Sequence, residues 1–384
     1  MMKQTAHRIE SFKESIFATM SKLALDNNAI NLSQGFPDFE GPEWIRKIAS
    51  EKVLNGNNQY APYPGSVNLR KALQGLYQKN YSLTYDWNQE ISISVGATEA
   101  IYSIITAVVN PGDEVILFEP FYDSYQASII MNGGIVKPVT LHAPHFSFNE
   151  SDLEKAITAK TKMIIVNSPH NPTGKMFSKS ELEFISSLAI KHDLYVLSDE
   201  VYEYLTFDGN VHIPMAQMKG MKDRTFTVSS AGKTLGLTGW KIGWVCTSPE
   251  LTTKFRMVRQ FTSFSVATPF QEAVAEAIAQ FDSYIPEFQK LYLEKRNSFY
   301  QGLIDLGFTP KKPQGTYFIM CPIENKTKKS DVDYAMELIV LKKVAAIPPS
   351  VFYAQSKDGE KYLRFCFAKK TETLKNALSN LKNS

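Results

Sequence analysis

The sequence has few cysteines, no excess of charge of one sign and no long hydrophobic run. Its 384 residues include three cysteines, Cys246, Cys321 and Cys366. Such a small and scattered set is unsuited to a disulfide framework or a metal cluster. We therefore expect no metal site and a reducing compartment.

Basic and acidic side chains nearly balance, with 42 against 39 and a formal net charge of +3. Nucleic acids and anionic membranes are bound by clustered excess charge, so we expect neither partner. The most apolar helical stretch, Ile101–Val109, is interrupted by Ser103 and Thr106. It is much shorter than the roughly 20 residues of a membrane span. No apolar signal-peptide segment follows the charged first residues, and we expect a cytoplasmic protein.

What the sequence does have is an ordinary globular composition, 43% apolar and 21% charged. Its length suggests two or three domains, because single cores rarely grow beyond roughly 250–300 residues. Short β-type segments alternate with helical stretches, which include Glu99–Val109, Ser178–His192 and Pro269–Tyr300. The expected strands are Ile91–Val95, Glu114–Phe118, Gly134–Val139, Lys162–Val166, Leu194–Ser198, Thr225–Ser229 and Ile242–Cys246. This alternation predicts an α/β fold with an open, mostly parallel sheet flanked by helices.

The two ends of the chain have a different pattern. An extended segment with glycine and proline, Leu32–Phe39, follows an N-terminal helical stretch. Strand-like segments at Tyr317–Cys321 and Tyr362–Phe367 flank a helix at Asp331–Lys342. We expect both ends to form one smaller α+β domain. The predicted division is 1–49 for the N-terminal segment and part of the small domain, 50–285 for the large domain and 286–384 for the small C-terminal domain.

Lys233, in the segment Gly232-Lys233-Thr234, has three interpretations. A lysine taken alone is most often a surface residue. A phosphate loop of the nucleotide-hydrolase type requires a glycine five residues before Gly232, where Thr227 stands. A dinucleotide-binding loop lacks support as well, since Gly96-Ala97-Thr98 after the first strand has no further glycines. The third interpretation is a lysine that forms a Schiff base with a carbonyl cofactor.

A pyridoxal cofactor would need a carboxylate, hydrogen-bond donors and a phosphate cradle, and each has a candidate at the end of an expected strand. Asp199 offers the carboxylate, although an isolated acid is more often a solvated cap. Asn171 offers a donor, or is an ordinary Asn-Pro turn residue. Gly96-Ala97-Thr98 would open a helix whose N-terminus suits a phosphate, unless Thr98 merely caps that helix.

Four motifs in order resemble those of the class I pyridoxal-phosphate aminotransferases of fold type I. They are Asn171-Pro172-Thr173-Gly174, Asp199-Glu200-Val201-Tyr202, Ser230-Ala231-Gly232-Lys233 and Gly239-Trp240-Lys241-Ile242-Gly243. The likeness runs from about Ile30 to the C-terminus. Further segments resemble the bacterial methionine aminotransferases and their kynurenine–glutamine relatives: 31–39, 58–62, 119–125 and 364–367. The resemblance implies a large domain with a mostly parallel sheet and a smaller α+β domain.

The resemblance also implies the cofactor, pyridoxal 5'-phosphate, and the residues that hold it. Lys233 would carry it as a Schiff base, Asp199 would pair with its ring nitrogen, and Tyr202 would complete the catalytic group with them. Asn171 and Tyr202 would donate to its phenolic oxygen, and Tyr122 would stack on the ring. The implied phosphate contacts are Ala97, Thr98, Ser230, Lys241 and, from the partner subunit of a homodimer, Tyr60. Tyr60 and Tyr122 could instead be ordinary packing aromatics.

The substrate site implied by the resemblance consists of Gly35, Asn171, Arg364, Phe264 and Ile16. By this resemblance Arg364 would bind the carboxylate. A bland interpretation of Arg364 is hard to sustain, because an arginine in an apolar segment must be paired or face a ligand. Phe264 would come from the partner subunit. The kynurenine enzymes commonly have a histidine after that phenylalanine, where Ser265 stands, and a tryptophan where this chain offers Ile16 or Phe17.

The expected reaction is therefore transfer of an amino group from a neutral amino acid to a 2-oxo acid. No second arginine is evident at the places where the family's dicarboxylate enzymes carry one. Methionine is the preferred candidate donor, with aromatic amino acids, leucine, glutamine or kynurenine as others. One alternative is a β-lyase acting on cysteine conjugates with the same cofactor. Another is a non-catalytic binding protein that retains the fold.

Overall fold

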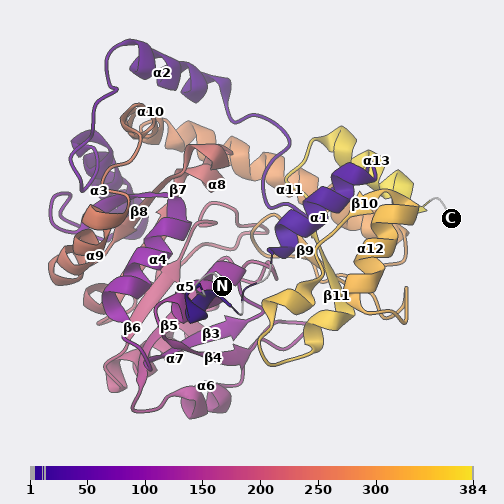
Figure 1. The fold of residues 1–384 in the computed structure, drawn as a ribbon. Helices are drawn as coiled ribbons and strands as arrows, with labels where there is room; N and C mark the ends of the chain where they lie inside the picture. Colours follow the sequence, from indigo (N-terminus) through magenta and orange to yellow (C-terminus); the bar gives the residue numbers. More distant parts are fainter. Residues whose placement is uncertain (1–4, 11, 13, 383–384) are drawn as a thin grey trace.

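The computed structural model describes residues 5–10, 12 and 14–382, and it has two lobes (Figure 1). The central lobe contains a seven-stranded sheet in the order β2-β8-β7-β6-β5-β3-β4. All neighbouring strands are parallel except β8, which is antiparallel to both β2 and β7. The strands are β2 (Ile91–Val95), β3 (Glu114–Glu119), β4 (Ile135–Thr140), β5 (Thr161–Asn167), β6 (Tyr195–Asp199), β7 (Thr225–Ser230) and β8 (Ile242–Cys246). The α/β prediction is confirmed, and each expected strand of this sheet ends within one residue of the observed position.

The apolar segment 163–166 shows why the sequences of the central strands are continuously hydrophobic. Its side chains alternate between two buried clusters, with Met163 and Ile165 in one and Ile164 and Val166 in the other. Helices cover both faces of the sheet, so neither face can be polar. These helices include α4 (Gly96–Val108), α5 (Asp123–Met131), α6 (Glu150–Ala156), α7 (Lys179–Lys191) and α9 (Pro249–Thr262).

The second lobe, which we call the terminal lobe, is formed from both ends of the chain (Figure 1). Ile30 in β1 pairs in parallel with Val344 in β10, and β11 pairs antiparallel with β9. The elements of this lobe are α1 (Ile16–Asp26), β1 (Ile30–Asn31), β9 (Phe318–Pro322), α12 (Asp331–Lys342), β10 (Val344–Ala345), β11 (Tyr362–Cys366) and α13 (Thr371–Lys382). The domain boundaries given above remain a prediction, and helix α11 crosses the second of them.

The expected helical stretch 269–300 is two helices, so its prediction as one stretch was wrong. Helix α10 (Thr268–Ile278) and helix α11 (Phe281–Asp305) are separated at residues 279–280. Gln280 donates from its backbone to Ala277 and closes a turn there. Helix α10 packs on α2 (Glu43–Leu54) and α3 (Val67–Tyr81) of the central lobe. The break therefore lets the chain leave those helices and continue toward the terminal lobe.

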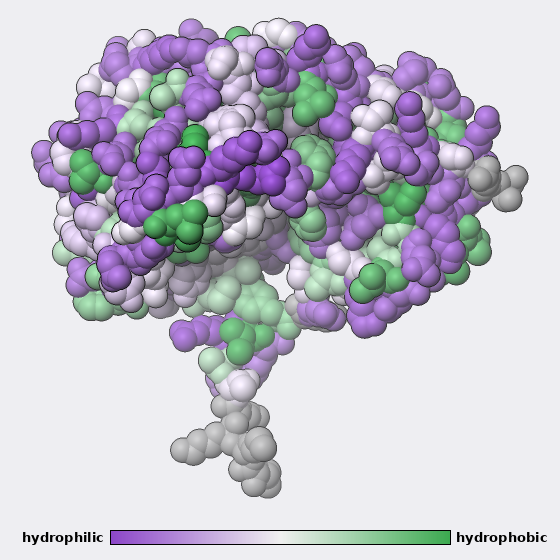
Figure 2. All heavy atoms as spheres, turned by 90° about the horizontal axis from the view of Figure 1, so that it is seen from above, coloured by the Kyte–Doolittle hydropathy of each residue, from purple (hydrophilic) through white to green (hydrophobic). Residues whose placement is uncertain are grey.

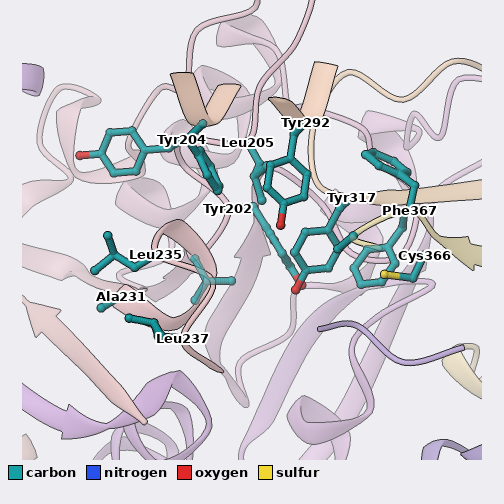
Figure 3. Packing of buried hydrophobic residues seen from close by; sticks show 14 of the residues in the cluster. Tyr202, Tyr204, Leu205, Ala231, Leu235, Leu237, Tyr292, Tyr317, Cys366 and Phe367 are labelled. Carbon is teal, nitrogen blue, oxygen red and sulfur yellow. The ribbon is translucent and has the colours of Figure 1, made fainter. Parts of the chain in front are cut away.

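Short elements complete the described chain, and they are α8 (Ala231–Thr234) and the 3-10 turns η1 (His7–Ile9), η2 (Met215–Gln217), η3 (Lys222–Arg224), η4 (Thr238–Trp240), η5 (Pro349–Phe352) and η6 (Asp358–Lys361). Among residues 5–10, 12 and 14–382, no helix is long and apolar enough to cross a membrane. The face in Figure 2 is mostly hydrophilic with scattered hydrophobic patches. The largest buried cluster runs through both lobes, and Figure 3 shows Tyr202 of the central lobe packed beside Tyr317 of the terminal lobe.

Candidate active site

A cavity of about 350 Å³ lies between the two lobes, at the carboxyl ends of the parallel strands. Ligands of open α/β sheets bind at this edge. Of the sequence-predicted site residues, eleven line it: Gly35, Ala97, Thr98, Tyr122, Asn171, Asp199, Tyr202, Ser230, Lys233, Lys241 and Arg364. The structure thus brings together residues that are more than 300 positions apart in the chain.

Lys233 extends from the short helix α8, which follows directly on strand β7. Its Nζ donates to the hydroxyl of Tyr317 at 3.1 Å and to the carbonyl of Gly35 at 3.3 Å. Burial lowers the pKa of this amine to about 8, and nearby Asp199 opposes that shift. An amine with a pKa near neutrality can both accept and release a proton, which is what a general acid and base requires.

Asp199, the last residue of β6, is buried with 4% of its surface exposed. The hydroxyl of Tyr125 donates to its Oδ2 at 2.6 Å, and the backbone N–H of Val201 donates to Oδ1 at 3.3 Å. Burial raises the pKa of Asp199 to about 6, against these two hydrogen bonds and the positive charge of Lys233. A buried carboxylate of this kind is suited to a cationic ligand atom, which would supply the missing countercharge.

Tyr125 contacts Asp199 and Tyr317 contacts Lys233, and the sequence analysis missed both residues. Tyr125 lies on helix α5, one turn beyond Tyr122, and the two rings meet edge to face with centroids 5.7 Å apart. Tyr122 is the N-cap residue that precedes this helix, and both tyrosines stand in the segment 119–125 that carries the resemblance, so the signal was present in the sequence. Tyr317 precedes β9, and no local pattern points from there to Lys233.

Two acids that follow Asp199 fix the backbone behind it. Glu200 accepts hydrogen bonds from His212 at 2.9 Å and from Ser198 at 2.7 Å. Glu203 accepts from Ser229 at 2.6 Å and from Tyr81 at 2.7 Å. Both carboxylates are buried, and such satisfied polar networks rigidify the segment that they join. These hydrogen bonds therefore hold the segment 199–203 in place, while Asp199 faces the cavity.

An anion cradle lies at the other end of the cavity, where helix α4 begins. The helix presents free backbone N–H groups and the positive end of its dipole at residues 96–98. Ser230 and the exposed ammonium of Lys241 lie beside it, and Lys241 adopts a left-handed φ of 54°. Gly243 is required here, because a Cβ atom would come within 2.6 Å of the carbonyl carbon of Gly96. The backbone approach and the donors suit a phosphate group.

Arg364 on β11 is fully buried, and it is stacked on Phe318 with its guanidinium carbon 4.0 Å from the ring centroid. One terminal nitrogen donates to Asn171 Oδ1 at 2.9 Å, and the other donates to the carbonyl of Ser33 at 2.8 Å. Its Nε has no hydrogen-bond partner in the described chain. A buried cation that faces a cavity and has no carboxylate among its hydrogen-bond partners is typical of an anion-binding site.

Gly35 reaches the cavity because its segment lies beside β11. Leu32 accepts from the backbone N–H of Cys366 at 2.8 Å, and Phe36 accepts from Lys369 Nζ at 2.7 Å. The carbonyl of Gly35 also accepts from the Tyr317 hydroxyl at 2.6 Å. The N-terminal segment is therefore anchored to the terminal lobe on both sides of Gly35.

Tyr202 and Tyr122 form aromatic walls of the cavity. The Tyr202 ring meets the Tyr317 ring edge to face, with centroids 5.3 Å apart (Figure 3), and Lys233 Nζ lies 5.7 Å from the Tyr202 centroid. Burial raises the pKa of Tyr122 to about 12, so its phenol is neutral at ordinary pH. His170 lies behind them, buried and hydrogen-bonded to Thr173 at 2.8 Å. Burial lowers the pKa of His170 to about 3, which suits a structural residue.

Three predicted residues are absent from the described cavity lining. Tyr60 is 82% exposed and Phe264 45% exposed, and their rings contact each other with centroids 5.4 Å apart. Ile16 is partly buried and packs against the cluster that runs through both lobes. Its neighbour Phe17 lines the cavity instead, with its ring centroid 5.3 Å from the guanidinium carbon of Arg364. The choice between Ile16 and Phe17 depends on how α1 docks, and this is not visible in the sequence.

Comparisons with known proteins show which family this chain resembles. The family described as aminotransferase class I and II matches residues 27–381. A kynurenine–oxoglutarate transaminase of Dictyostelium discoideum is 39% identical, over 99% of this chain and 95% of its own length. The Escherichia coli methionine aminotransferase is 37% identical, over 96% of this chain and 95% of its own length. The solved structure of N-succinyldiaminopimelate aminotransferase from Mycobacterium tuberculosis has a TM-score of 0.96 and 38% identity, over 99% of both chains.

Proposed function

This chain belongs to the class I and II aminotransferase family and is a transaminase, and we propose that its amino donor is a neutral amino acid, with methionine as the first candidate. One observation supports the proposal above all others. Lys233, Asp199 and Arg364 face one cavity that also contains an anion cradle. The named relatives act on methionine, kynurenine and N-succinyldiaminopimelate, so the choice among donors depends on this chain's own cavity.

We propose pyridoxal 5'-phosphate as the cofactor because the residues present fit each of its parts. The helix N-terminus with Ser230 and Lys241 suits the phosphate, and the buried carboxylate of Asp199 suits a protonated ring nitrogen. Asn171 and Tyr202 would contact the phenolic oxygen, and Tyr122 would cover the ring. When bound, this cofactor supplies an electron sink for the bond that breaks at the substrate carbon.

The chain's own residues then bind the substrate and move one proton. Arg364 would bind the substrate carboxylate through donors that it now directs at Asn171 and Ser33. This contact would hold the reacting carbon in place near Lys233, which is an orientation effect. The amine of Lys233 would remove the proton from that carbon and would then donate it to a carbon of the bound cofactor. Tyr317 and Gly35 hold the amine while it is free.

The cavity lining favours a donor with an uncharged side chain. Phe17, Phe36, Ile101 and Phe318 contribute apolar surface, and Arg364 is the single arginine among the described residues that line it. A donor with a second carboxylate would have no arginine to pair with, so its charge would lose hydration without compensation. Methionine, with its flexible and weakly polar thioether, fits such walls.

We propose that the enzyme is a homodimer and that Tyr60 and Phe264 complete the site of the partner subunit. Both rings are large, aromatic and exposed in the single chain, as is typical of residues at protein interfaces. A two-fold dimer would place the same pair on both sides of the interface. Sedimentation of the purified protein, with and without Tyr60→Ala, would measure this assembly.

The proposed function is tested by a visible spectrum recorded while the purified enzyme with pyridoxal phosphate is titrated with single amino acids. Methionine is expected to change the cofactor band and to yield its 2-oxo acid once an acceptor is added. Glutamate and aspartate are the matched controls with charged side chains. Preference for either control would contradict a neutral donor. Release of pyruvate and ammonia from a cysteine conjugate would instead indicate the β-lyase reaction.

A further inference from the structure

Glu119, the last residue of strand β3, makes an unusual contact between the lobes. Its side chain is fully buried. Oε2 accepts from the backbone N–H groups of Ala354 at 2.8 Å and Gln355 at 3.0 Å. Oε1 accepts from the backbone N–H of Ser356 at 2.9 Å and from the hydroxyl of Thr140 at 2.8 Å. One carboxylate of the central lobe thus accepts hydrogen bonds from three consecutive backbone amides of the terminal lobe.

The chemistry of this contact requires a negative charge. The hydrogen-bond partners of Glu119 in the described residues are these four donors and include no lysine, arginine or histidine, so the four donors alone compensate its burial. Consecutive backbone N–H groups that converge on one point form an anion-binding concavity. Hydrogen bonds to an ionised acceptor are roughly twice as strong as neutral ones. We call Glu119 and residues 354–356 the interlobe latch.

The latch lies next to both walls of the active site. On the central lobe, Glu119 is followed closely by Tyr122, and the backbone N–H of Phe121 donates to the carbonyl of Phe352 at 2.9 Å. On the terminal lobe, the Phe352 ring lies 5.4 Å from the guanidinium carbon of Arg364. The same ring lies 5.9 Å from that of Phe17. Any movement of residues 349–356 would therefore move the surface against which Arg364 rests.

We propose that Glu119 is a positioning residue for the substrate carboxylate site. By holding residues 354–356 at the end of β3, it keeps Phe352 packed on Arg364, so that the guanidinium is aligned before the substrate arrives. The proposal rests on the role of Arg364 proposed above. The cofactor cradle, at the ends of β2 and β7, does not depend on this contact.

The test compares Glu119→Gln with Glu114→Gln, a matched change at the other end of the same strand. Glu114 accepts from Thr158 at 2.6 Å and makes no contact with the terminal lobe in the described chain. We expect Glu119→Gln to raise KM for the amino donor by about tenfold, since the lost charge weakens several hydrogen bonds. We expect kcat to change by less than about threefold and the cofactor spectrum to remain unchanged. Glu114→Gln should leave KM unchanged.

A second measurement does not depend on activity. Hydrogen exchange of the amides of residues 354–356 should be at least about tenfold faster in Glu119→Gln and unchanged in Glu114→Gln. Glu119→Asp keeps the charge with a shorter reach, so it should recover part of both effects. It also replaces Glu119→Gln if that variant does not fold. Unchanged exchange, or an equal loss in kcat and in cofactor binding with unchanged KM, would overturn the proposal.

Arg364→Lys distinguishes this inference from the proposed function. If Arg364→Lys raises KM and Glu119→Gln does not, the carboxylate site stands and the latch is only structural. If Arg364→Lys leaves KM unchanged, the proposed carboxylate site is wrong and the positioning role fails with it. Faster exchange without any change in KM would likewise leave Glu119 as a fold contact and overturn the positioning role.

Discussion

The two walls of the active-site cavity are built in different ways. On the central lobe, Asp199 ends strand β6 and Asn171 follows the adjacent parallel strand β5, so their positions depend on one sheet edge. On the terminal lobe, Arg364 is held by Ser33, a residue 331 positions away in the chain. In the proposed mechanism the sheet wall bears the groups for the chemical step, whereas the terminal wall bears the arginine that would bind the substrate carboxylate. The difference predicts that variants of the first wall lower kcat and variants of the second raise KM.

The largest effect is expected from Lys233→Ala on the sheet wall. The amine is the group that would transfer the proton, and loss of such a group together with cofactor attachment should lower kcat by roughly 10⁴-fold or more. Single-turnover rates with methionine measure it. Lys241→Ala, a nearby lysine on the phosphate side, is the control and should mainly weaken cofactor binding. Normal turnover in Lys233→Ala would refute the site.

Asp199→Asn should lower kcat by roughly 10²–10³-fold, because it removes the buried charge that would pair with the ring nitrogen of the proposed cofactor. It should also stabilise the protein prepared without cofactor. Burial raises the pKa of Asp199 from 3.8 to about 6. Between these values the folded state retains a proton that the unfolded chain has lost. The wild-type free energy of unfolding therefore falls by about 2 kcal/mol as the pH rises from about 4 to about 6, and the full loss of about 3 kcal/mol is reached above about pH 7.

Denaturant unfolding at pH 4 and pH 7.5 checks this linkage. Asp199→Asn should unfold with the same free energy as the wild type at the lower pH, apart from any change in packing, and be more stable at the higher one. Tyr125→Phe is the control, since it keeps the carboxylate and removes one donor to it. Equal stability of Asp199→Asn and wild type at both pH values would show that the buried charge is compensated.

Arg364→Lys tests the terminal wall and should raise KM by roughly 30–100-fold. A lysine cannot reproduce the planar donor pair of a guanidinium, and a lost charged hydrogen bond weakens binding by about 1.5–3 kcal/mol. The cofactor spectrum should be unchanged, because the cradle belongs to the other wall. A fall in kcat with unchanged KM would contradict the division between the walls.

The smallest effect is expected from Phe17→Ala. Its ring covers Arg364 and lines the cavity, so KM for hydrophobic donors should rise by roughly five- to tenfold. Ile16→Ala is the matched neighbour and should leave KM near its original value. If Ile16→Ala had the greater effect on KM, the residue chosen from the sequence would be the substrate contact after all.

The sequence predicted the sheet wall better than the terminal wall for a physical reason. Asp199 and Asn171 are set by where strands end, and strand ends follow from local apolar periodicity. The contacts of Tyr317 with Lys233 and of Phe17 with Arg364 depend on how distant segments dock. Arg364 itself was found through the family resemblance, and its place in an apolar segment added that it must be paired or face a ligand. Glu119 carried no such signal, since its partners are backbone amides.

The break between α10 and α11 is a second feature that depends on distant contacts and that the local sequence did not predict. Local pattern indicated helix throughout 269–300, and no strong breaker marks residues 279–280. Tertiary packing decided the outcome, because Ile278 and Phe281 both enter the core that spans the lobes. The strands of the central sheet are buried on both faces, and their continuous apolar segments predicted their positions without such an ambiguity.

The alkylation rates of the three cysteines can report how often each lobe opens by local unfolding. All are buried, with Cys246 in β8 of the central sheet and Cys321 and Cys366 in β9 and β11 of the terminal lobe. Burial raises the pKa of each thiol, so alkylation of the folded protein must await local unfolding. Mass spectrometry of labelled peptides over time would therefore report how often each lobe opens, without an engineered probe.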